Sequence, residues 1–542
     1  MKERKTDPIC GMTVSSNSAL HVERDGQNFY FCSEQCRQQF LAATSVAQRA
    51  SPGVIVIFGA SGDLTRRKLL PALYNLVANG LLNEDFAIIG VARRPWSEAE
   101  FRQQMRDGME AFATQKVDME LWAKLEPRIH YCQGSFDDPT TYDRLKTMMA
   151  ESDTTHHTGG NALFYLSVQH GSFAAIAQHL HTSGLTGENE QAWRRVVIEK
   201  PFGQDLASAR ALNASLSAIL AERQIYRIDH YLGKETAQNL MVFRLGNSMI
   251  EPIWNRQYID HIEISVAETL GLEGRGAVYE KAGAFRDVMQ NHMFMLLALV
   301  AMEPPTSLAG EAVRNEKVKL LEAMRLPKPE EVLRDSVRGQ YGPGEIDGKP
   351  VVGYRSEPNV SAGSVVETFA AMKFWVDNWR WAGVPFYLRT GKRLNRRVTE
   401  IVVHFKSPPL ALFGGTECSP LGPNLLIMHI QPEEGITLQM RAKTPGPTIH
   451  AQAVTLDFDY SQFGTVAPTT GYEKLLYDCM IGDQTLFHRS DMVEAAWKVG
   501  DPIMDAWENN PPNDFPNYAP GSWGPPESGQ LLLRDGCRWW TI

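Results

Sequence analysis

Residues 54–64 read VIVIFGASGDL, a run of β-branched residues that leads directly into a glycine turn. The run predicts a buried strand, and apolar residues at helical spacing over 69–77 predict a helix after it. Gly59 and Gly62 permit a tight turn through which the backbone can approach a pyrophosphate at the positive end of that helix. The spacing lacks the full three-glycine fingerprint, and a purely structural strand-to-helix turn has the same pattern.

Five further apolar runs follow this unit, and helical segments separate them: 86–92, 128–132, 162–168, 195–199 and 225–229. Continuous apolar strands that alternate with amphipathic helices predict a parallel sheet covered on both faces. Six such strands would complete a doubly wound, Rossmann-type α/β sheet.

The texture of the sequence changes after about residue 235. Alternating apolar and polar runs at 261–269, 399–407, 424–432 and 435–443 predict a mainly antiparallel sheet in a large α+β domain, with a hairpin turn at PEEG. We therefore expect three parts: a small cysteine-containing module at 1–45, a dinucleotide-binding domain at 53–230, and an α+β substrate and dimerisation domain at 231–542.

Composition narrows the partners of this chain. Its 542 residues carry a formal net charge of -9, so neither a nucleic acid nor a membrane is expected as the partner. The longest apolar run, 294–302, is too short to span a bilayer. Seven cysteines in a chain of this length do not form a disulfide scaffold, which predicts a cytoplasmic protein.

Charged residues follow two of the predicted strands at their carboxyl ends, where open parallel sheets bind ligands. Arg93 and Arg94 follow the second strand, where an arginine can accommodate a 2′-phosphate; a solvated pair is the alternative. The stretch RIDHYLGKE, 227–235, ends the sixth strand with a carboxylate, a hydroxyl and two cationic side chains. These side chains suit the binding of a phosphorylated polyol; the alternative is that the segment is an ordinary surface loop after a strand.

Two later segments complete the candidate site. His292 stands where polar sequence gives way to an apolar helix, and a histidine is the natural general base at neutral pH; a capping or core role is the alternative. Asp287 lies five residues earlier, about 140° away around an ideal α-helix, so α-helical geometry does not pair the two. The cation-rich segment 386–397 is either a phosphate site or a solvated basic loop.

Six blocks occur together and in order: GASGDLTRRKLLPALYNL, VIEKPFGQDL, RIDHYLGKE, DVMQNH, DNWRWAGVPFYLRTGKRL and SWGP. Together they resemble the glucose-6-phosphate dehydrogenase family from about residue 53 to the C-terminus. The resemblance implies oxidation of D-glucose 6-phosphate to 6-phospho-D-glucono-1,5-lactone with hydride transfer to NADP, the first step of the oxidative pentose phosphate pathway. It also implies a homo-oligomer, a dimer or a tetramer, and leaves NAD open as a second cofactor.

The resemblance implies a role for each matching residue. His292 would take the proton from the C1 hydroxyl, and Asp229 would hold the histidine and stabilise its charge. The implied cofactor-binding residues are Gly59, Ser61, Gly62, Asp63, Leu64, Arg93 and Lys200. The implied substrate-binding residues are Lys68, Lys200, His230, Tyr231, Lys234, Glu268, Asp287, Lys392, Arg397 and Gln431. In the family a cis proline follows the lysine of EKPFG, so the position of Lys200 would depend on the bond to Pro201.

One departure from the family pattern lies close to the cofactor region. Where the family has two prolines after the fourth strand, this chain has Gln169 and His170. The loop loses two rigid residues, which puts cofactor affinity and selectivity in doubt but leaves the catalytic blocks unchanged.

Residues 6–40 resemble a YHS-type module, which occurs beside heavy-metal transport domains. Cys10, Cys32 and Cys36 could bind a soft metal ion, and the pair four residues apart is expected on one helical face. A small fold that buries its cysteines as apolar residues is the alternative.

Two other functions remain to be weighed against a dehydrogenase. A sugar oxidoreductase of the glucose–fructose type shares a strand-end EKP but lacks the RIDHYLGKE and DVMQNH blocks. A metal-handling or sensing protein with a non-catalytic dehydrogenase body would carry damage at Asp229, Lys234 or His292, and all three residues are intact.

Overall fold

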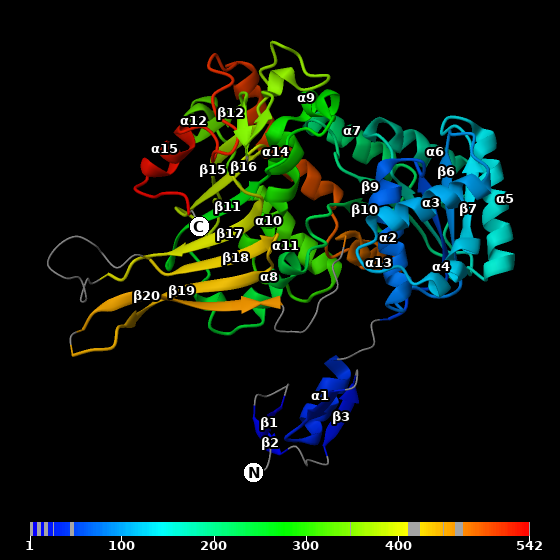
Figure 1. Cartoon of the computed structure of the whole chain (residues 1–542), viewed down its shortest axis with the longest axis horizontal. Coiled ribbons are helices and arrows are strands. Elements are labelled where there is room, and N and C mark those ends of the chain that lie inside the picture. The colour runs from blue at the N-terminus through cyan, green and yellow to red at the C-terminus, as the bar shows by residue number, and fades with distance from the viewer. Residues whose placement is uncertain are drawn as a thin grey trace.

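The structure is a computed structural model that describes residues 4–7, 12–15, 20–24, 27–43, 48–346, 348–409, 423–447, 449–460 and 470–540. Figure 1 shows a small N-terminal module, a parallel sheet flanked by helices and a second, larger sheet. The predicted fold class is confirmed in each part.

The six predicted strands form one parallel sheet in the order β10-β9-β8-β5-β6-β7, the doubly wound arrangement. Their bounds are β5 Gly53–Phe58, β6 Phe86–Ala92, β7 Ile129–Gln133, β8 Ala162–Leu166, β9 Arg194–Glu199 and β10 Ile225–Ile228. In β5, Ile55 and Ile57 join one hydrophobic core while Val54, Val56 and Phe58 join another. Successive side chains of a strand point to opposite faces, so this split shows that both faces are covered.

Helices cover the two faces of this sheet (Figure 1). Their bounds are α2 Leu70–Ala78, α3 Glu98–Phe112, α4 Met119–Leu125, α5 Pro139–His156, α6 Phe173–Thr182 and α7 Leu206–Ser217. Short helical turns are η1 Thr65–Leu69, η2 Glu126–Arg128, η3 His170–Ser172 and η4 Glu222–Gln224.

The second sheet has eight strands in the order β12-β15-β16-β11-β17-β18-β19-β20. Their bounds are β11 Ile259–Ala267, β12 Ser336–Gly339, β15 Phe369–Trp375, β16 Pro385–Gly391, β17 Val398–Phe405, β18 Leu425–Gln431, β19 Gly435–Lys443 and β20 Ala451–Asp459. Neighbouring strands run antiparallel except β11 and β16, which are parallel. The predicted hairpin is confirmed, because His429 of β18 faces Gly435 of β19.

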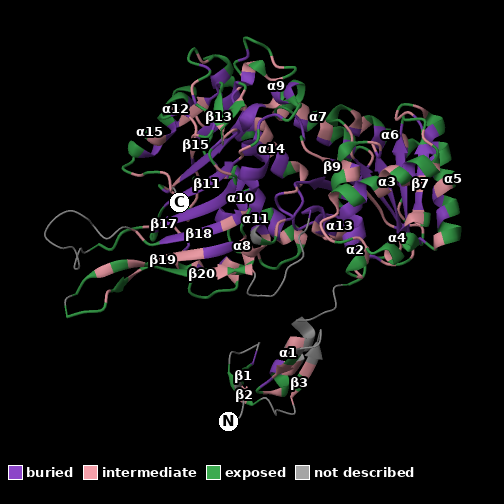
Figure 2. Ribbon diagram, in the orientation of Figure 1, coloured by how far each residue is buried: buried purple, intermediate pink, exposed green. Residues whose placement is uncertain are grey.

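Burial decreases toward one edge of this sheet. Figure 2 shows β11, β17 and β18 as largely buried, whereas β20 is mostly exposed. The remaining elements of this part are α8 Glu235–Leu245, α9 Gly276–Ala284, η6 Phe285–Met293, α10 Phe294–Ala301, α11 Gly310–Glu322, α12 Pro329–Asp335, α13 Tyr472–Ile481, α14 Ser490–Glu508, α15 Glu527–Leu533, the hairpin β13 Gly344–Ile346 with β14 Lys349–Val351, and the turns η5 Glu251–Ile253 and η7 Tyr354–Ser356.

Two C-terminal helices return to the parallel sheet. α13 packs against α2, where Asn75 donates to Glu473 over 2.7 Å, and α14 packs against α7, where Asn213 donates to the Ser490 carbonyl over 3.1 Å. The two large sheets are therefore joined by side-chain contacts as well as by the chain.

The N-terminal module contains β1 Arg4–Thr6, β2 Thr13–Ser15, β3 His21–Arg24, β4 Gln27–Tyr30 and α1 Glu34–Ala43. The helix begins at Glu34, so Cys32 precedes it, and the prediction that Cys32 and Cys36 share a helical face is wrong. Their sulfur atoms nevertheless lie 3.7 Å apart. Across the described ranges, no helix has the length and apolar character needed to cross a membrane.

Candidate active site

A buried histidine and a buried carboxylate meet where the sixth strand of the parallel sheet ends. Asp229 follows β10, and His292 lies in η6, far away in the chain. The His292 Nδ1 to Asp229 Oδ1 distance is 2.5 Å, and the two side chains are only 2% and 1% exposed. The Tyr231 amide donates to the same oxygen over 3.0 Å. Asp229 therefore fixes the ring through Nδ1 and leaves Nε2 for another partner.

The local helix geometry differs from the one assumed from the sequence. η6 is a π-helix, in which hydrogen bonds join residues five apart. Asp287 and His292 are five apart, and each charge acts on the pKa of the other. The α-helical expectation that separated them is thus wrong, because a π-helix brings these positions to the same side.

The pKa values of the pair shift in directions that suit a base and its partner. Burial opposes ionisation of Asp229, but the charge and hydrogen bond of His292, with His488 nearby, hold the Asp229 pKa well below its usual range. Burial lowers the pKa of His292, and the Asp229 carboxylate only partly opposes this. Burial thus favours the neutral imidazole that can accept a proton, and the Asp229 carboxylate favours the charged imidazole once it forms.

Two aromatic side chains from the same strand end pack against His292. The ring of Tyr231 stacks on the His292 ring with centroids 4.1 Å apart, and His230 lies edge-on at 5.0 Å. Burial and then the neighbouring His292 charge lower the pKa of His230 to about 3. In the absence of an anion, His230 is consequently a neutral hydrogen-bonding group.

Two ion pairs lie beside this cluster and bring together four of the predicted substrate residues. Lys200 Nζ donates to the Asp287 carboxylate over 3.0 Å and to its carbonyl over 2.8 Å, and the Lys200–Pro201 bond is cis as predicted. Lys392 Nζ donates to the Glu268 carboxylate. Each pair offers both donors and an acceptor to a polyol.

Cations from three separate segments also gather here. Burial lowers the pKa of Lys68, and the charges of Lys234, Arg67 and Arg397 lower it further, with Glu473 opposing. Arg397 donates to Gln431 over 3.5 Å, and Gln431 in turn donates to the Tyr231 hydroxyl over 3.4 Å. Cations that disfavour the charged form of a neighbouring lysine create a site at which an anionic ligand is stabilised.

The glycine turn after β5 has the conformation that its sequence predicts. Gly59 has φ of +82°, and a Cβ there would lie 2.1 Å from the Ser167 carbonyl oxygen. Gly62 and Asp63 are exposed, Ser61 and Leu64 are partly exposed, and Asp63 pairs with Arg67 at 3.1 Å.

Three residues outside this turn that bear on cofactor binding, Arg93, Gln169 and His170, are exposed. Arg93 lies at the carboxyl end of β6. Gln169 and His170 follow Ser167 at the start of η3, so the altered loop lies directly beside the glycine turn.

Sequence reasoning missed two residues of the cluster, the partly exposed Glu199 and the buried His488. Burial raises the pKa of Glu199 to about 7 against hydrogen bonds from Tyr165, at 2.5 Å, and Tyr472. His488 Nε2 lies 3.6 Å from Asp229 Oδ2. The adjacency of Glu199 to Lys200 was a usable signal, whereas no local pattern marks His488.

Two groups of possible metal ligands belong to regions already described. Asp229, His230 and His292 converge within 4.8 Å, but Lys200 and Lys234 also act on this group, and a cation is disfavoured beside them. In the N-terminal module, the ligand atoms of Asp7, Cys32 and Cys36 lie within 4.8 Å of one another, and sequence reasoning missed Asp7. Cys10 lies outside the described residues.

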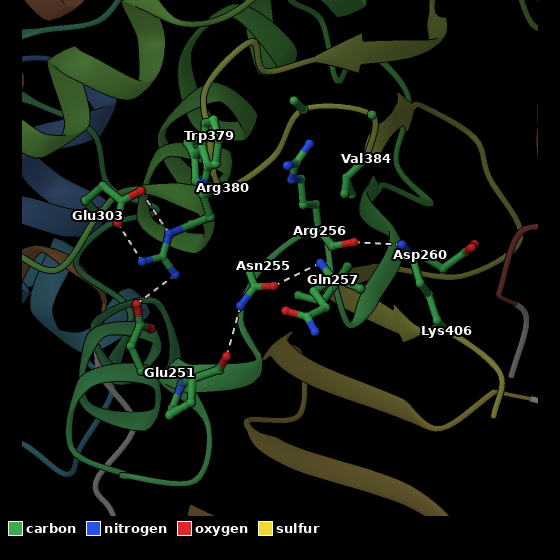
Figure 3. Close-up of a pocket in the computed structure, with 14 residues that line it drawn as sticks. Glu251, Asn255, Arg256, Gln257, Asp260, Glu303, Trp379, Arg380, Val384 and Lys406 are labelled. Carbon is green, nitrogen blue, oxygen red and sulfur yellow. Dashed lines mark hydrogen bonds and ion pairs between the residues drawn. The ribbon is translucent and has the colours of Figure 1, made fainter. Parts of the chain in front are cut away.

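A cavity of about 940 Å³ lies away from the active-site cluster, between η5, β11 and the segment after β15 (Figure 3). Arg380 in its wall pairs with Glu303 at 2.5 Å and with Glu251 at 2.8 Å. None of the predicted catalytic or binding residues lines this cavity.

Comparison with known proteins gives three family matches. The NAD binding domain of glucose-6-phosphate dehydrogenase matches residues 56–239, its C-terminal domain matches 241–540, and the YHS domain matches 5–44. A glucose-6-phosphate 1-dehydrogenase from Bacillus subtilis is 45% identical over 491 residues, covering 90% of this chain and 98% of the relative. One from Chlamydia pneumoniae is 44% identical over 507 residues, covering 93% and 98%.

Solved structures agree with these matches. A glucose-6-phosphate dehydrogenase in complex with its substrate glucose-6-phosphate superposes with a TM-score of 0.81 at 34% identity, covering 91% of this chain and 99% of that one. The Mycobacterium avium glucose-6-phosphate 1-dehydrogenase gives 0.75 at 35% identity over the same shares.

Proposed function

The chain belongs to the glucose-6-phosphate dehydrogenase family, and on that premise we propose that it oxidises D-glucose 6-phosphate at C1 with NADP as the hydride acceptor. The product is 6-phospho-D-glucono-1,5-lactone. The observation that carries the proposal is the hydrogen bond between His292 and Asp229 at the carboxyl edge of the parallel sheet. A sensing protein with an inactive body is not favoured, since this pair is intact.

His292 acts as the general base. Its Nδ1 is held by Asp229, so Nε2 accepts the proton of the C1 hydroxyl. The neutral imidazole is ready for this step because burial lowers its pKa. The charge that forms is then stabilised by the Asp229 carboxylate, whose own position is supported by the Tyr231 amide.

The residues around the glycine turn fit a dinucleotide phosphate. The left-handed backbone of Gly59 and the exposed start of the following helix leave room for a pyrophosphate near Gly62. Ser61, Asp63 and Leu64 complete this turn, and Arg93 would hold the 2′-phosphate that distinguishes NADP from NAD. When bound, the nicotinamide supplies the hydride acceptor.

A phosphate dianion fits the cation group on the other side of His292. In the absence of an anion, the charge of Lys68 is disfavoured by Lys234 and by Arg397. His230 and Tyr231 add a ring nitrogen and a hydroxyl beside them. A dianion beside His230 would also raise its pKa and allow it to bind as a cation.

The two ion pairs bind the sugar hydroxyls. Lys200 with Asp287 and Lys392 with Glu268 provide donors and acceptors on both sides of the ring, and Gln431 links this region to Tyr231. Lys200 also approaches the cofactor side, because it follows β9 at the same sheet edge as Gly59.

Four further assignments complete the proposal. The domains divide at residues 45, 53 and 230, the protein is a cytoplasmic homo-oligomer, and the N-terminal module binds one soft metal ion. The convergence of Asp7, Cys32 and Cys36 supports the last assignment.

Assay of the purified chain by NADPH absorbance tests the function. Glucose 6-phosphate should be oxidised far better than free glucose, and Lys234→Ala should raise the KM for glucose 6-phosphate about 10- to 100-fold, the value of a charged hydrogen bond. Lys124→Ala, an exposed lysine on α4, is the control. Equal efficiency for the two sugars would reject the phosphate site.

A further inference from the structure

A second cluster of histidine and carboxylate side chains lies inside the mixed sheet. His261 of β11 faces His404 of β17 across the antiparallel pair, and Glu263 is two residues further along β11. Residues two apart in a strand share a face, so the three side chains project to the same side of the sheet. The histidine rings stack with centroids 3.9 Å apart and 18° between their planes.

Three polar atoms of this cluster converge without hydrogen bonds. Glu263 Oε1 lies 2.8 Å from His404 Nε2 and 3.5 Å from His261 Nε2, and the three atoms lie within 4.8 Å of one another. Among the residues that the structure describes, none of the three atoms has a hydrogen bond of acceptable geometry. Their residues are 1%, 4% and 8% exposed for Glu263, His261 and His404.

Convergence of this kind calls for a ligand. Buried polar atoms that lack hydrogen bonds are unfavourable, and a ligand to which all of them can bind removes this cost. Two imidazole nitrogens and one carboxylate oxygen at these separations match the donors of a transition-metal site.

Neighbouring groups contact the atoms of His261 and Glu263 that point away from the converging donors. Asp260 Oδ2 lies 2.7 Å from His261 Nδ1, and the Trp540 amide donates to Glu263 Oε2 over 2.9 Å. Asp260 sits where the register of β11 against β17 shifts, and such a bulge re-aims a side chain. A carboxylate on Nδ1 of a histidine that ligates through Nε2 is the usual outer support of a bound metal.

We propose that His261 Nε2, His404 Nε2 and Glu263 Oε1 bind one Zn(II) ion. Two nitrogen donors and one oxygen donor suit a borderline ion, and the carboxylates of Glu263 and Asp260 balance its two charges. The neighbouring Arg389 acts electrostatically on Glu263 and on Glu400, but its N–H groups donate to neutral oxygens, the Ser265 hydroxyl over 2.9 Å and the Trp540 carbonyl over 3.2 Å.

The fourth position of a tetrahedral ion is assigned to water. Cys537 Sγ lies 3.7 Å from His261 Nδ1, on the opposite side of the ring from Nε2, so a thiolate is not placed for that position. Asp260 lines the cavity of about 940 Å³ in Figure 3 on the Nδ1 side of His261, whereas His261, Glu263 and His404 do not line it. The ion would fasten the C-terminal segment to the sheet through the Glu263 contact with Trp540.

The test uses the full chain carrying Cys10→Ser, Cys32→Ser and Cys36→Ser, which removes the thiols of the N-terminal module. After chelation and equilibrium dialysis against Zn(II), this protein should hold one equivalent and melt at a higher temperature than its metal-free form. Adding Glu263→Gln should abolish both effects, while Asp260→Asn should weaken binding about 10- to 100-fold. His429→Gln, a partly buried histidine on β18, is the matched control and should retain the ion.

Replacing Zn(II) by Co(II) checks the ligand set. Binding with no thiolate charge-transfer band supports the nitrogen and oxygen donors, and such a band in the triple-serine background would reject them in favour of Cys537. No stoichiometric Zn(II) in the triple-serine protein would overturn the proposal even if Glu263→Gln failed to fold. Retained binding in a folded Glu263→Gln protein would overturn it equally.

Discussion

Two buried histidine–carboxylate clusters in this chain differ in what surrounds them. At the edge of the parallel sheet, His292 has one carboxylate on Nδ1 and the Lys200 cation nearby, and burial lowers its pKa. Inside the mixed sheet, His261 has Asp260 on Nδ1 and Glu263 3.5 Å from Nε2, and the ring of His404 stacks on its own. The same side-chain types thus leave one imidazole nitrogen free in one place and bring two imidazole nitrogens and one carboxylate oxygen together in the other.

The contrast follows from electrostatics rather than from the degree of burial. Both histidines are almost fully buried, at 2% and 4% exposure for His292 and His261. A cationic neighbour and a single carboxylate leave the His292 imidazole able to accept a proton, whereas two imidazoles and a carboxylate around one point provide the donor atoms of a bound metal ion. The comparison therefore assigns proton transfer to the first cluster and cation binding to the second.

Matched substitutions should separate the two clusters most strongly. His292→Asn should lower turnover about 10²- to 10⁴-fold with little change in substrate binding, because it removes the general base. His404→Gln should leave turnover within about twofold, since it lies outside the reacting groups. Steady-state kinetics with NADPH absorbance measure both. Equal turnover of His292→Asn and the unmodified enzyme would break the comparison.

The parallel sheet could be predicted well from the sequence, for a physical reason. Its strands are buried on both faces, so each reads as a continuous apolar run, and β5 to β10 all formed where such runs occur. In the mixed sheet, β11, β17, β18 and β19 were predicted, whereas β12, β15, β16 and β20 were not, and neither was the parallel pairing of β11 with β16. Alternation reports which face of a strand is buried, not the direction of its neighbour.

The candidate site was predicted less completely. Local blocks located Asp229 and His292, but an α-helical pitch separated His292 from Asp287, and the π-helix brings them together. His488 reaches Asp229 only through the tertiary fold, and no pattern around it reveals this contact. The cluster of His261, Glu263 and His404 was missed for the same reason, because His404 lies more than one hundred residues from His261.

The cofactor side of the first cluster gives the next largest effect. Arg93→Ala should raise the KM for NADP about 10- to 100-fold and change the KM for NAD little, because only NADP carries the 2′-phosphate. Michaelis constants for both cofactors measure this. If both rise alike, the selectivity instead resides in Arg94 or in the loop at Gln169 and His170.

The pH profile should sharpen the contrast further. His292 must be neutral to accept a proton, and burial lowers its pKa. The midpoint of the acid limb of the kcat/KM profile should therefore lie at a pH below the ordinary histidine pKa of about 6.5. Activity should drop about tenfold per pH unit below that limb. His404→Gln should give a superimposable profile. If the acid limb instead has its midpoint near pH 7 and disappears in Glu199→Gln, the titrating group is Glu199, whose pKa is raised to about 7.

The smallest effect on catalysis is expected from the third group of metal ligands, in the N-terminal module. The Cys10→Ser, Cys32→Ser and Cys36→Ser protein should lose one equivalent of a soft ion such as Cu(I), because thiolates supply most of its donors. Turnover should stay within about twofold, since every proposed catalytic residue lies beyond the linker. Metal analysis and kinetics on one preparation measure both, and Cys132→Ser, a buried cysteine on β7, controls for general thiol loss. A folded triple variant with strongly reduced turnover would show that the N-terminal module belongs to the catalytic unit. The comparison would then have to treat the module as coupled to the His292 cluster rather than as independent of it.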